Sequence, residues 1–235
     1  MDKERLQEFF KRQWKEWRGF FFFVTFILIP LKSSLADWNW VPTGSMNPTI
    51  VEGDLVYVNK LAYDLRFPLT LHRLAEWSEP ERGDVVVLFS PEKERTRLVK
   101  RVIALPGDTV EMRRNVLYLN GEPLEYTELD EDEVADLQPD LRRRSVFAEE
   151  DLAGRRHAVM SLPRMHTPLR NFPRTLVPEG SVFVMGDNRD LSKDSRSFGF
   201  ADRKSIVGRA SHVIVSFNKL DKYQPRFGRF FSALK

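Results

Sequence analysis

Apolar residues along the chain form one long uninterrupted segment near the N-terminus and then only short runs. The long segment, residues 19–31, reads GFFFFVTFILIPL and contains no charge. Tryptophans lie on both sides of it, at positions 14, 17, 38 and 40, and tryptophan prefers the boundary between membrane and water. A helix from Trp17 to Trp38 would rise about 30 Å, which is the thickness of the hydrocarbon layer. The pattern therefore predicts a transmembrane anchor over residues 19–37.

The charges around this segment predict its orientation. The bases that precede it are Lys3, Arg5, Lys11, Arg12, Lys15 and Arg18. Because cytoplasmic flanks carry the excess of Lys and Arg, residues 1–18 are predicted to be cytoplasmic and residues 38–235 to form an extracytoplasmic domain. One alternative is open: Ser34-Leu35-Ala36 is a small-x-small site, so residues 1–36 could be a cleaved signal peptide. The long charged front end, with four acids among its bases, favours a retained anchor.

After residue 50 the pattern changes to short runs rich in β-branched residues, bounded by polar or turn residues. A meander over residues 109–124 contains Asn120-Gly121, a strong signal for a two-residue hairpin turn. The other strand candidates are residues 54–61, 84–90, 97–105, 181–188 and 208–217. No long amphipathic helix is evident in this part of the sequence. The fold predicted is a mostly β body, an antiparallel sheet or partly closed barrel, preceded by an N-terminal transmembrane helix.

Residues 122–180 interrupt this pattern and are predicted to be an insertion in the body. Their acidic run consists of Glu128, Asp130, Glu131, Asp132, Glu133 and Asp136, and Arg142, Arg143 and Arg144 follow it. Runs of like charge are usually solvated surface, which is the interpretation adopted for both.

Composition excludes several classes of function. The 235 residues suffice for one domain of ordinary size or two small ones, and 42% of them are apolar, enough for a real core. A net charge of +3 does not suggest a nucleic-acid partner. Cysteine is absent, and the four histidines are scattered without metal-ligand spacing. We therefore predict no metal, and without a glycine-rich phosphate loop we predict no cofactor.

A lone serine lies just beyond the apolar segment, in the stretch PTGSMNPTI (42–50). A serine in a loop usually has no catalytic part, and an unaided hydroxyl is a poor nucleophile that needs a base. The stretch contains no G-x-S-x-G elbow, and none of the histidines lies in a recognisable motif. The remaining partner known for a serine nucleophile is a neutral lysine, so Ser45 is a candidate only if such a lysine exists.

Lys100 is the best lysine for that part. It lies in RLVKRVIAL (97–105), where strand alternation would place Leu98, Lys100, Val102 and Ala104 on one face. A lysine on an apolar face loses solvation, which favours its neutral form. The alternative is an edge-strand lysine that reaches solvent.

A third stretch, MGDNRDLSKDSRSFG (185–199), follows an apolar strand and a glycine turn. It is dense in carboxylates, guanidinium groups and hydroxyls that can brace one another by charge-assisted hydrogen bonds.

Taken in order, PTGSMNPTI, GDLVYVNKLAY, RGDVVVLFSP with LVKRVIALPGDTV, and MGDNRDLSKDSRSFG resemble the successive motif boxes of bacterial type I signal peptidases. The resemblance spans residues 20–118 and 181–217. It implies Ser45 as nucleophile and Lys100 as general base, with the Thr43 hydroxyl and the Ser45 backbone N–H as the oxyanion hole. The supporting residues that it implies are Ser192, which would orient Lys100, and two structural ion pairs, Asp187 with Arg101 and Asp194 with Arg196. The family's usual motif has serine where this chain has Thr43, which keeps the hydroxyl but is stiffer at χ1.

The activity that this resemblance implies is cleavage of signal peptides by a serine endopeptidase with a Ser/Lys dyad. The expected partners are exported preproteins with small residues at positions −3 and −1 and membrane phospholipid, and the expected location is the bacterial inner membrane. The alternatives are a self-cleaving Ser/Lys protease and an anchored β module that binds signal peptides without cutting them. The anchor and the GDNRD stretch count against the first, and intact Ser45 and Lys100 count against the second.

Overall fold

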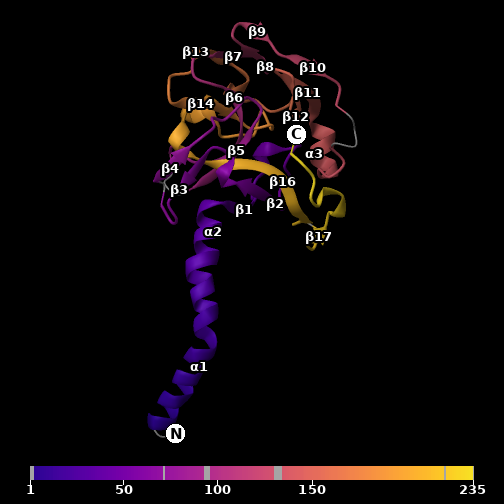
Figure 1. Cartoon of the computed structure of the whole chain (residues 1–235). Coiled ribbons are helices and arrows are strands. Elements are labelled where there is room, and N and C mark those ends of the chain that lie inside the picture. Colours follow the sequence, from indigo (N-terminus) through magenta and orange to yellow (C-terminus); the bar gives the residue numbers. More distant parts are fainter. Residues whose placement is uncertain (1–2, 71, 93–95, 130–133, 220, 235) are drawn as a thin grey trace.

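A computed structural model describes residues 3–70, 72–92, 96–129, 134–219 and 221–234. Figure 1 shows a long helical stem at the N-terminus that runs into a body built of strands. The body is mostly β and its sheets are antiparallel, as predicted. Its short helices lie at turns and on the flank of the sheets.

The stem consists of three consecutive helical segments, α1 (Lys3–Phe23), the π-helical η1 (Val24–Leu28) and α2 (Ile29–Ser34). Among the described residues, no single helix combines the length and the apolar character needed to cross a bilayer. Membrane anchoring by residues 19–37 therefore stays a prediction. Charged residues fill the first part of α1, and the apolar residues after it are divided among the three segments. The last helical segment ends at Ser34, and residues 36 and 37 of the predicted span belong to strand β1.

The main sheet carries the order β1-β2-β16-β5-β6-β14-β15, and β17 pairs with β16 at its side. The sheet is strongly curled (Figure 1). Its strands are β1 (Ala36–Trp40), β2 (Asp54–Asn59), β5 (Val85–Phe89), β6 (Arg97–Ala104), β14 (Ser181–Met185), β15 (Ala201–Asp202), β16 (Ile206–Asn218) and β17 (Gln224–Pro225). The runs predicted as strands at 54–61, 84–90, 97–105, 181–188 and 208–217 each overlap one of these strands. The prediction from the alternation of β-branched and polar residues is thus confirmed for strand existence, with boundaries that shift by a few residues.

Two smaller sheets lie at the end of the body away from the stem (Figure 1). One has the order β13-β7-β8-β9 and the other the order β10-β11-β12. Their strands are β7 (Thr109–Arg113), β8 (Val116–Leu119), β9 (Glu122–Pro123), β10 (Glu125–Thr127), β11 (Val146–Leu152), β12 (Arg155–Ser161) and β13 (Phe172–Leu176). The turn at Asn120-Gly121 joins β8 to β9, with positive φ at both residues, as a two-residue hairpin turn requires. A separate hairpin, β3 (Asp64–Arg66) with β4 (Arg73–Glu76), lies beside the stem.

The segment 122–180, predicted to be an insertion, forms β9 to β13 and helix α3 (Pro139–Arg144). Its acidic run lies partly outside the described residues, since positions 130–133 are among those left out. The described arginines of α3 are exposed, as expected for a solvated charged surface. Whether the segment is an insertion stays a prediction, but its strands are tied to the rest: β13 pairs with β7, and β12 bridges to residue 188.

Candidate active site

Three segments that are distant in the sequence meet at Ser45. The first is the 3-10 turn η2 (Gly44–Met46), the second is strand β6, and the third is the stretch after β14. The side chain of Met46, 1% exposed, packs into an apolar cluster with Ile50 and Val58 and fixes the turn against the sheet. Ser45 is therefore held on a short, firmly packed turn, with its side chain directed toward β6.

Lys100 lies opposite this serine. Its Nζ is 2.7 Å from Ser45 Oγ and donates a second hydrogen bond, of 2.8 Å, to the carbonyl of Val99. The side chain is buried, with 2% exposure, so the alternative of a solvent-reaching lysine is wrong. In the neutral amine the lone pair accepts the Ser45 hydroxyl proton while one N–H remains on Val99 O. The pair is thus placed for proton transfer from serine to lysine.

Burial sets the protonation of this lysine. Loss of solvation lowers the pKa of Lys100 to about 8, against the opposing charges of Asp194 and then Asp187, while Arg196 lowers it further. Both carboxylates are occupied by arginines, and neither forms an ion pair with Nζ within the described part of the chain. A substantial fraction of the amine is therefore neutral near physiological pH, where an unperturbed lysine would be less than about 1% neutral.

Strand alternation explains only part of the apolar surroundings of Lys100. Leu98 and Val102 do belong to one apolar cluster, as predicted, but Ala104 packs in another with Ile103. The register between β6 and β14 shifts at this point, because Phe183 faces Ala104 and the next residue, Val184, faces Val102. The extra residue on β6 reverses the alternation after Val102, which a count along the sequence could not reveal.

The ion pairs suggested by the resemblance are present in the structure. Arg101 donates two hydrogen bonds of 2.8 Å to Asp187, and both side chains are 1% exposed. Arg196 binds Asp194 through its Nε at 2.9 Å and its Nη2 at 2.7 Å. Both pairs have the bidentate geometry of strong charge-assisted hydrogen bonds, and both carboxylates lie behind the lysine.

The geometry supports the suggested roles of the other two residues, Thr43 and Ser192, less directly. Thr43 is exposed and lines the cavity in front of Ser45, consistent with a hydroxyl that faces a substrate. Ser192 is buried close to Asp194, and its hydroxyl helps to hold the pKa of that carboxyl down against the effect of burial. In the described residues the two hydrogen bonds of Lys100 Nζ go to Ser45 and Val99. Orientation of the lysine by Ser192 therefore stays a prediction.

Two residues that sequence reasoning left without a role hold the serine turn in place. Asn188 donates from its side chain to Gly44 O at 3.1 Å and from its backbone to Ser45 O at 3.2 Å. Gly186 passes so close to Ser45 O that a Cβ at this position would collide with it and with the Ser192 side chain. The dense polar stretch hinted at Asn188, but only the fold shows that it faces the turn.

A second group of supporting residues that sequence reasoning missed belongs to segment 122–180. Glu150 on β11 is fully buried and receives hydrogen bonds of 2.6 and 2.8 Å from Arg189. Met160 on β12 bonds through its backbone to Asp187 O and to the Arg189 N–H. The stretch that braces the lysine is thus itself backed by this part of the chain. Nothing in the sequence indicates which glutamate of an acidic segment points inward.

A cavity of about 460 Å³ opens in front of the pair. Its wall combines the catalytic candidates with apolar side chains from three elements: Thr43, Gly44, Ser45, Asn47, Glu52, Leu98, Lys100, Leu141, Asn188, Leu191 and Lys193. Throughout the described ranges no cluster of histidine and carboxylate side chains suits a metal ion. A candidate nucleophile, a candidate base and a cavity with apolar walls are thus brought together in one place. This pairing is the chemistry expected of a serine hydrolase that uses lysine as its base.

Comparison with known proteins identifies the family. The family model described as signal peptidase, peptidase S26, matches residues 14–215. A signal peptidase I of Pseudomonas aeruginosa is 35% identical over 211 residues, covering 84% of this chain and 71% of that protein. A signal peptidase I of Pseudomonas fluorescens is 32% identical over 221 residues, covering 89% and 75%. The crystal structure of a signal peptidase I from Enterococcus faecalis V583 is 32% identical, covering 56% of this chain and 97% of that chain with a TM-score of 0.35.

Because the match extends over most of the chain, the chain belongs to the signal peptidase family, peptidase S26. The resemblance to signal peptidases that the sequence motifs indicated is confirmed. The chain is an enzyme of this type, a serine endopeptidase that cleaves signal peptides.

Proposed function

We propose that this peptidase uses Ser45 as nucleophile and Lys100 as general base. The observation that carries the proposal is the 2.7 Å contact between the hydroxyl and a lysine with 2% exposure. Burial supplies the free amine that a base requires, and the packed turn supplies a fixed nucleophile. Arg101, Arg196 and their carboxylates act as positioning residues, since they brace the wall behind the lysine and do not reach the reacting atoms.

The reaction follows from this geometry. Neutral Lys100 takes the proton of Ser45 Oγ as the oxygen attacks the scissile carbonyl of the substrate. The Ser45 backbone N–H and the Thr43 hydroxyl donate to the oxyanion that develops, and the resulting ammonium returns the proton to the departing amine. A water molecule then enters, is deprotonated by the same amine and releases the acyl group from Ser45.

The proposed substrates are exported preproteins with small residues at positions −3 and −1. Such a segment would bind as an extended strand whose alternate side chains enter shallow pockets. The cavity before Ser45 is walled by Leu98, Leu141 and Leu191, which favours apolar contacts and limits side-chain volume. A preprotein with Phe at −1 should therefore remain uncut where one with Ala is cleaved.

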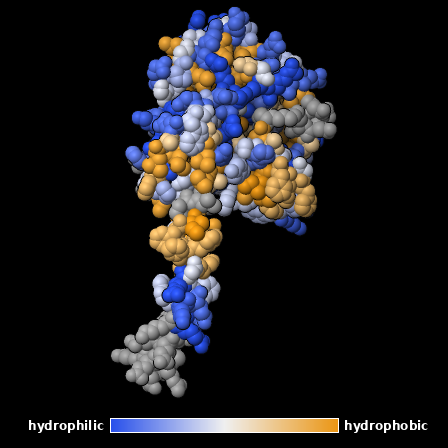
Figure 2. Space-filling view, in the orientation of Figure 1, coloured by the Kyte–Doolittle hydropathy of each residue, from blue (hydrophilic) through white to orange (hydrophobic). Residues whose placement is uncertain are grey.

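We also propose that the helical stem anchors the enzyme in the bacterial plasma membrane, with the catalytic body on the extracytoplasmic side. The side chains at 20–23 and 26–29 are all apolar, and all of them are exposed in the isolated chain. Figure 2 shows them as an apolar band on the stem directly below the body, followed by a hydrophilic section. An apolar band next to a basic section suits a segment held in a membrane with its N-terminus in the cytoplasm.

One experiment separates cleavage from binding. The detergent-solubilised protein is incubated with a preprotein, and the product is sized by electrophoresis beside the Ser45→Ala variant. Wild type should shorten the preprotein, while Ser45→Ala should lose activity by several orders of magnitude and keep its fold, because it lacks the nucleophile. Full activity of Ser45→Ala would refute the mechanism. Binding without shortening by wild type would instead favour an anchored binding module.

A further inference from the structure

The wall of the cavity before Ser45 includes a carboxylate that the proposed reaction does not use, that of Glu52. The side chain of Glu52 is exposed. Its Oε1 lies beside Gly44, 3.3 Å from the position that a Cβ on this glycine would take. Because Gly44 directly precedes the proposed nucleophile, Glu52 places a negative charge close to the reacting serine.

The turn that carries Glu52 is held in place by its neighbours. The carbonyl of Glu52 accepts a hydrogen bond of 3.0 Å from Arg226 Nη1. The Gly53 N–H donates to Val41 O at 3.0 Å, and a Cβ on Gly53 would collide with the carbonyl of Phe217. The backbone of Glu52 therefore has a fixed position relative to the sheet, and only side-chain rotation changes the reach of its carboxylate.

The carboxylate of Glu52 has no partner of its own. Throughout the residues that the structure describes, it forms no hydrogen bond and no ion pair. The basic side chains on the elements around it that do not pair with it are Arg142, Arg143 and Arg144 of α3, Lys193, Lys219 and Arg226. Lys193 pairs instead with Glu92, and Arg226 donates to backbone carbonyls and to Ser216 Oγ. A cation that enters the cavity would therefore find Glu52 available.

The alternation of side chains in an extended substrate indicates which residue would meet this carboxylate. In the proposed binding mode, small side chains at −3 and −1 face the enzyme. Alternate residues of a strand face the same way, so the next position on that face is +2, the second residue after the cut. Two residues span roughly 7 Å, which a cavity of about 460 Å³ can accommodate. Position +2 is thus the first one on this face that is free to carry a charge.

We propose that Glu52 selects the substrate residue at +2 by its charge, favouring Lys or Arg and disfavouring Asp or Glu. This inference rests on the proposed function, because it takes the position of the substrate from the proposed Ser45 nucleophile. The carboxylate would accept a charge-assisted hydrogen bond from a basic side chain and would repel an acidic one. Glu52 is therefore a specificity-determining residue and takes no part in the proton transfer.

The test compares kcat/KM for one preprotein with Lys, Ala or Asp at +2, using the full chain in a non-ionic detergent. Wild type should prefer Lys to Asp by about three- to tenfold, the size expected when attraction and repulsion at an exposed charge are combined. Added salt should reduce this ratio, since ions screen exposed charges. The same substitutions at +1 and +3 should have a smaller effect, because those side chains face away from the enzyme.

Variants of Glu52 then test whether this carboxylate is the source of the preference. Glu52→Gln should bring the ratio of Lys to Asp substrates close to one, and Glu52→Lys should invert it. Because the ratio is taken within one variant, it does not depend on how much of that variant is folded. A purely structural effect would change the rates for all three substrates alike and leave the ratio as in wild type.

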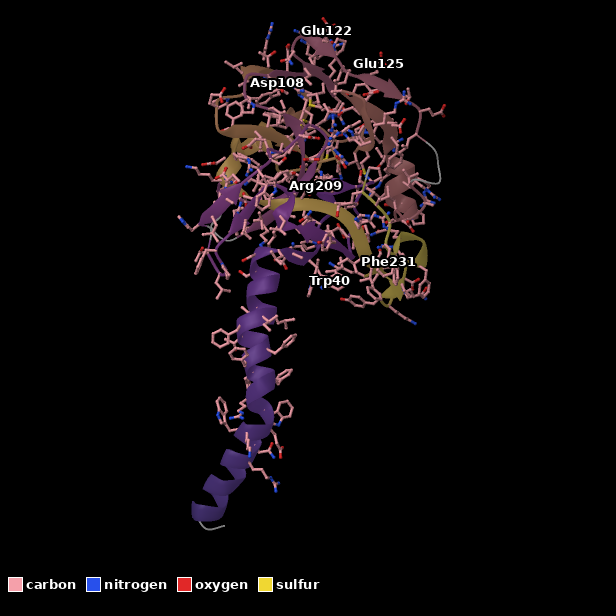
Figure 3. All side chains as sticks on the ribbon, viewed as in Figure 1. Trp40, Asp108, Glu122, Glu125, Arg209 and Phe231 are labelled. Carbon is pink, nitrogen blue, oxygen red and sulfur yellow. The ribbon has the colours of Figure 1, made fainter. Side chains whose placement is uncertain are left out.

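Glu122→Gln is the matched control and should keep the wild-type ratio. Glu122 is exposed on β9 and does not line the cavity before Ser45. Figure 3 shows it at the end of the body away from the stem.

Two results would overturn the assignment of Glu52. One is a wild-type ratio close to one, and the other is a wild-type ratio that Glu52→Gln retains. A preference for Lys at +1 or +3 without one at +2 would overturn the proposed position of the substrate.

Binding to Ser45→Ala keeps this inference apart from the proposed catalytic pair. Fluorescence anisotropy with labelled peptides that span the cleavage site should show tighter binding of the Lys peptide than of the Asp peptide. The double variant Ser45→Ala, Glu52→Gln should lose this difference. Selective binding together with full cleavage by Ser45→Ala, or with no cleavage by wild type, would refute the catalytic pair and support the selection by charge. Cleavage that depends on Ser45 but responds to no charge at +2, in rate or in binding, would refute the selection alone.

Discussion

At the scale of single residues, the proposed mechanism depends on one buried amine, that of Lys100. Lys100 is surrounded by apolar strand neighbours and by carboxylates that arginines already occupy. A carboxylate in direct contact would stabilise the ammonium and remove the base. The two bidentate arginine pairs thus keep Asp187 and Asp194 near the lysine without allowing either to bind it.

The first prediction concerns pH. Because the pKa of Lys100 is lowered to about 8, kcat/KM for a preprotein should rise with pH and level off above about pH 8. Below this value it should fall about tenfold per pH unit as the amine gains its proton. Initial rates measured between pH 6 and pH 10 give the pH at which kcat/KM reaches half of its plateau value. A half-maximal kcat/KM near pH 10.4 would show that the base is not a buried lysine.

The second prediction concerns the identity of the base. Lys100→Arg should be inactive at every pH, since a guanidinium stays protonated. Lys222→Arg, in an exposed turn before β17, is the matched control and should keep wild-type turnover. Circular dichroism of both variants checks the fold. Retained activity in Lys100→Arg would assign the proton transfer to another group.

The third prediction concerns Thr43. Thr43→Val removes the hydroxyl at nearly constant shape, and loss of one oxyanion donor costs about 3–4 kcal/mol of transition-state binding. The kcat should therefore fall about a hundredfold or more while KM changes little. Thr43→Ser restores the donor and should restore turnover. If Thr43→Val is as active as wild type, the oxyanion has a different donor.

At the scale of elements, the nucleophile turn and the stretch after β14 form one unit. The Thr43 side chain makes no capping hydrogen bond at the start of turn η2. Asn188 holds the turn by donating to the carbonyls of Gly44 and Ser45. Asp194 extends the unit, because it binds Arg196 and also accepts the Gly186 N–H at 3.0 Å. The distance between nucleophile and base is set by how closely this stretch approaches the turn.

The fourth prediction tests that approach. In Gly186→Ala the added methyl collides with the Ser45 carbonyl and with Ser192, so the serine turn and the stretch around residue 186 must shift relative to each other. A misplacement of about 1 Å costs on the order of a hundredfold in rate. Gly228→Ala, where a methyl meets nothing within 4 Å, is the control and should be silent. Comparison of kcat for the two variants decides whether close backbone approach matters.

At the scale of the whole molecule, the small sheets support the site from behind. Burial would raise the pKa of Glu150, but Arg189 and His157 hold it well below its usual range. The carboxylate is therefore charged in the folded protein, and its main partner belongs to the stretch that braces Lys100. Residues 122–180 thereby support the stretch that braces Lys100.

The fifth prediction follows from that contact. Glu150→Gln leaves Arg189 buried without its counter-charge, and breaking one side of a buried pair costs about 3–5 kcal/mol. Denaturant unfolding should show this loss in the free energy of unfolding. Glu149→Gln, the neighbour on β11 whose contacts are partly exposed, should cost less than about 1 kcal/mol. Equal losses in the two variants would contradict a special part for Glu150.

Much of this molecule could be predicted from its sequence, and the limits have physical causes. Strands in the body are short and β-branched, so their existence could be predicted, and the boxes around Ser45 and Lys100 led to the family. Strand order could not be predicted, because pairing between distant strands leaves no local pattern. The same holds for the bulge that shifts the alternation after Val102 and for the inward direction of Glu150. The stem was predicted as one apolar helix from its length, whereas local helix geometry divides it.

Strand β16 separates the two halves of the site and has a consequence for the timing of activity. It lies between β2 and β5, so it joins the half that follows the Ser45 turn to the half that holds β6. Residues 206–218 leave the ribosome after both halves. Until they do, the strand that follows the Ser45 turn and the strand that carries Lys100 share no sheet. The proposed catalytic pair is therefore expected to assemble only after residues 206–218 have been synthesised.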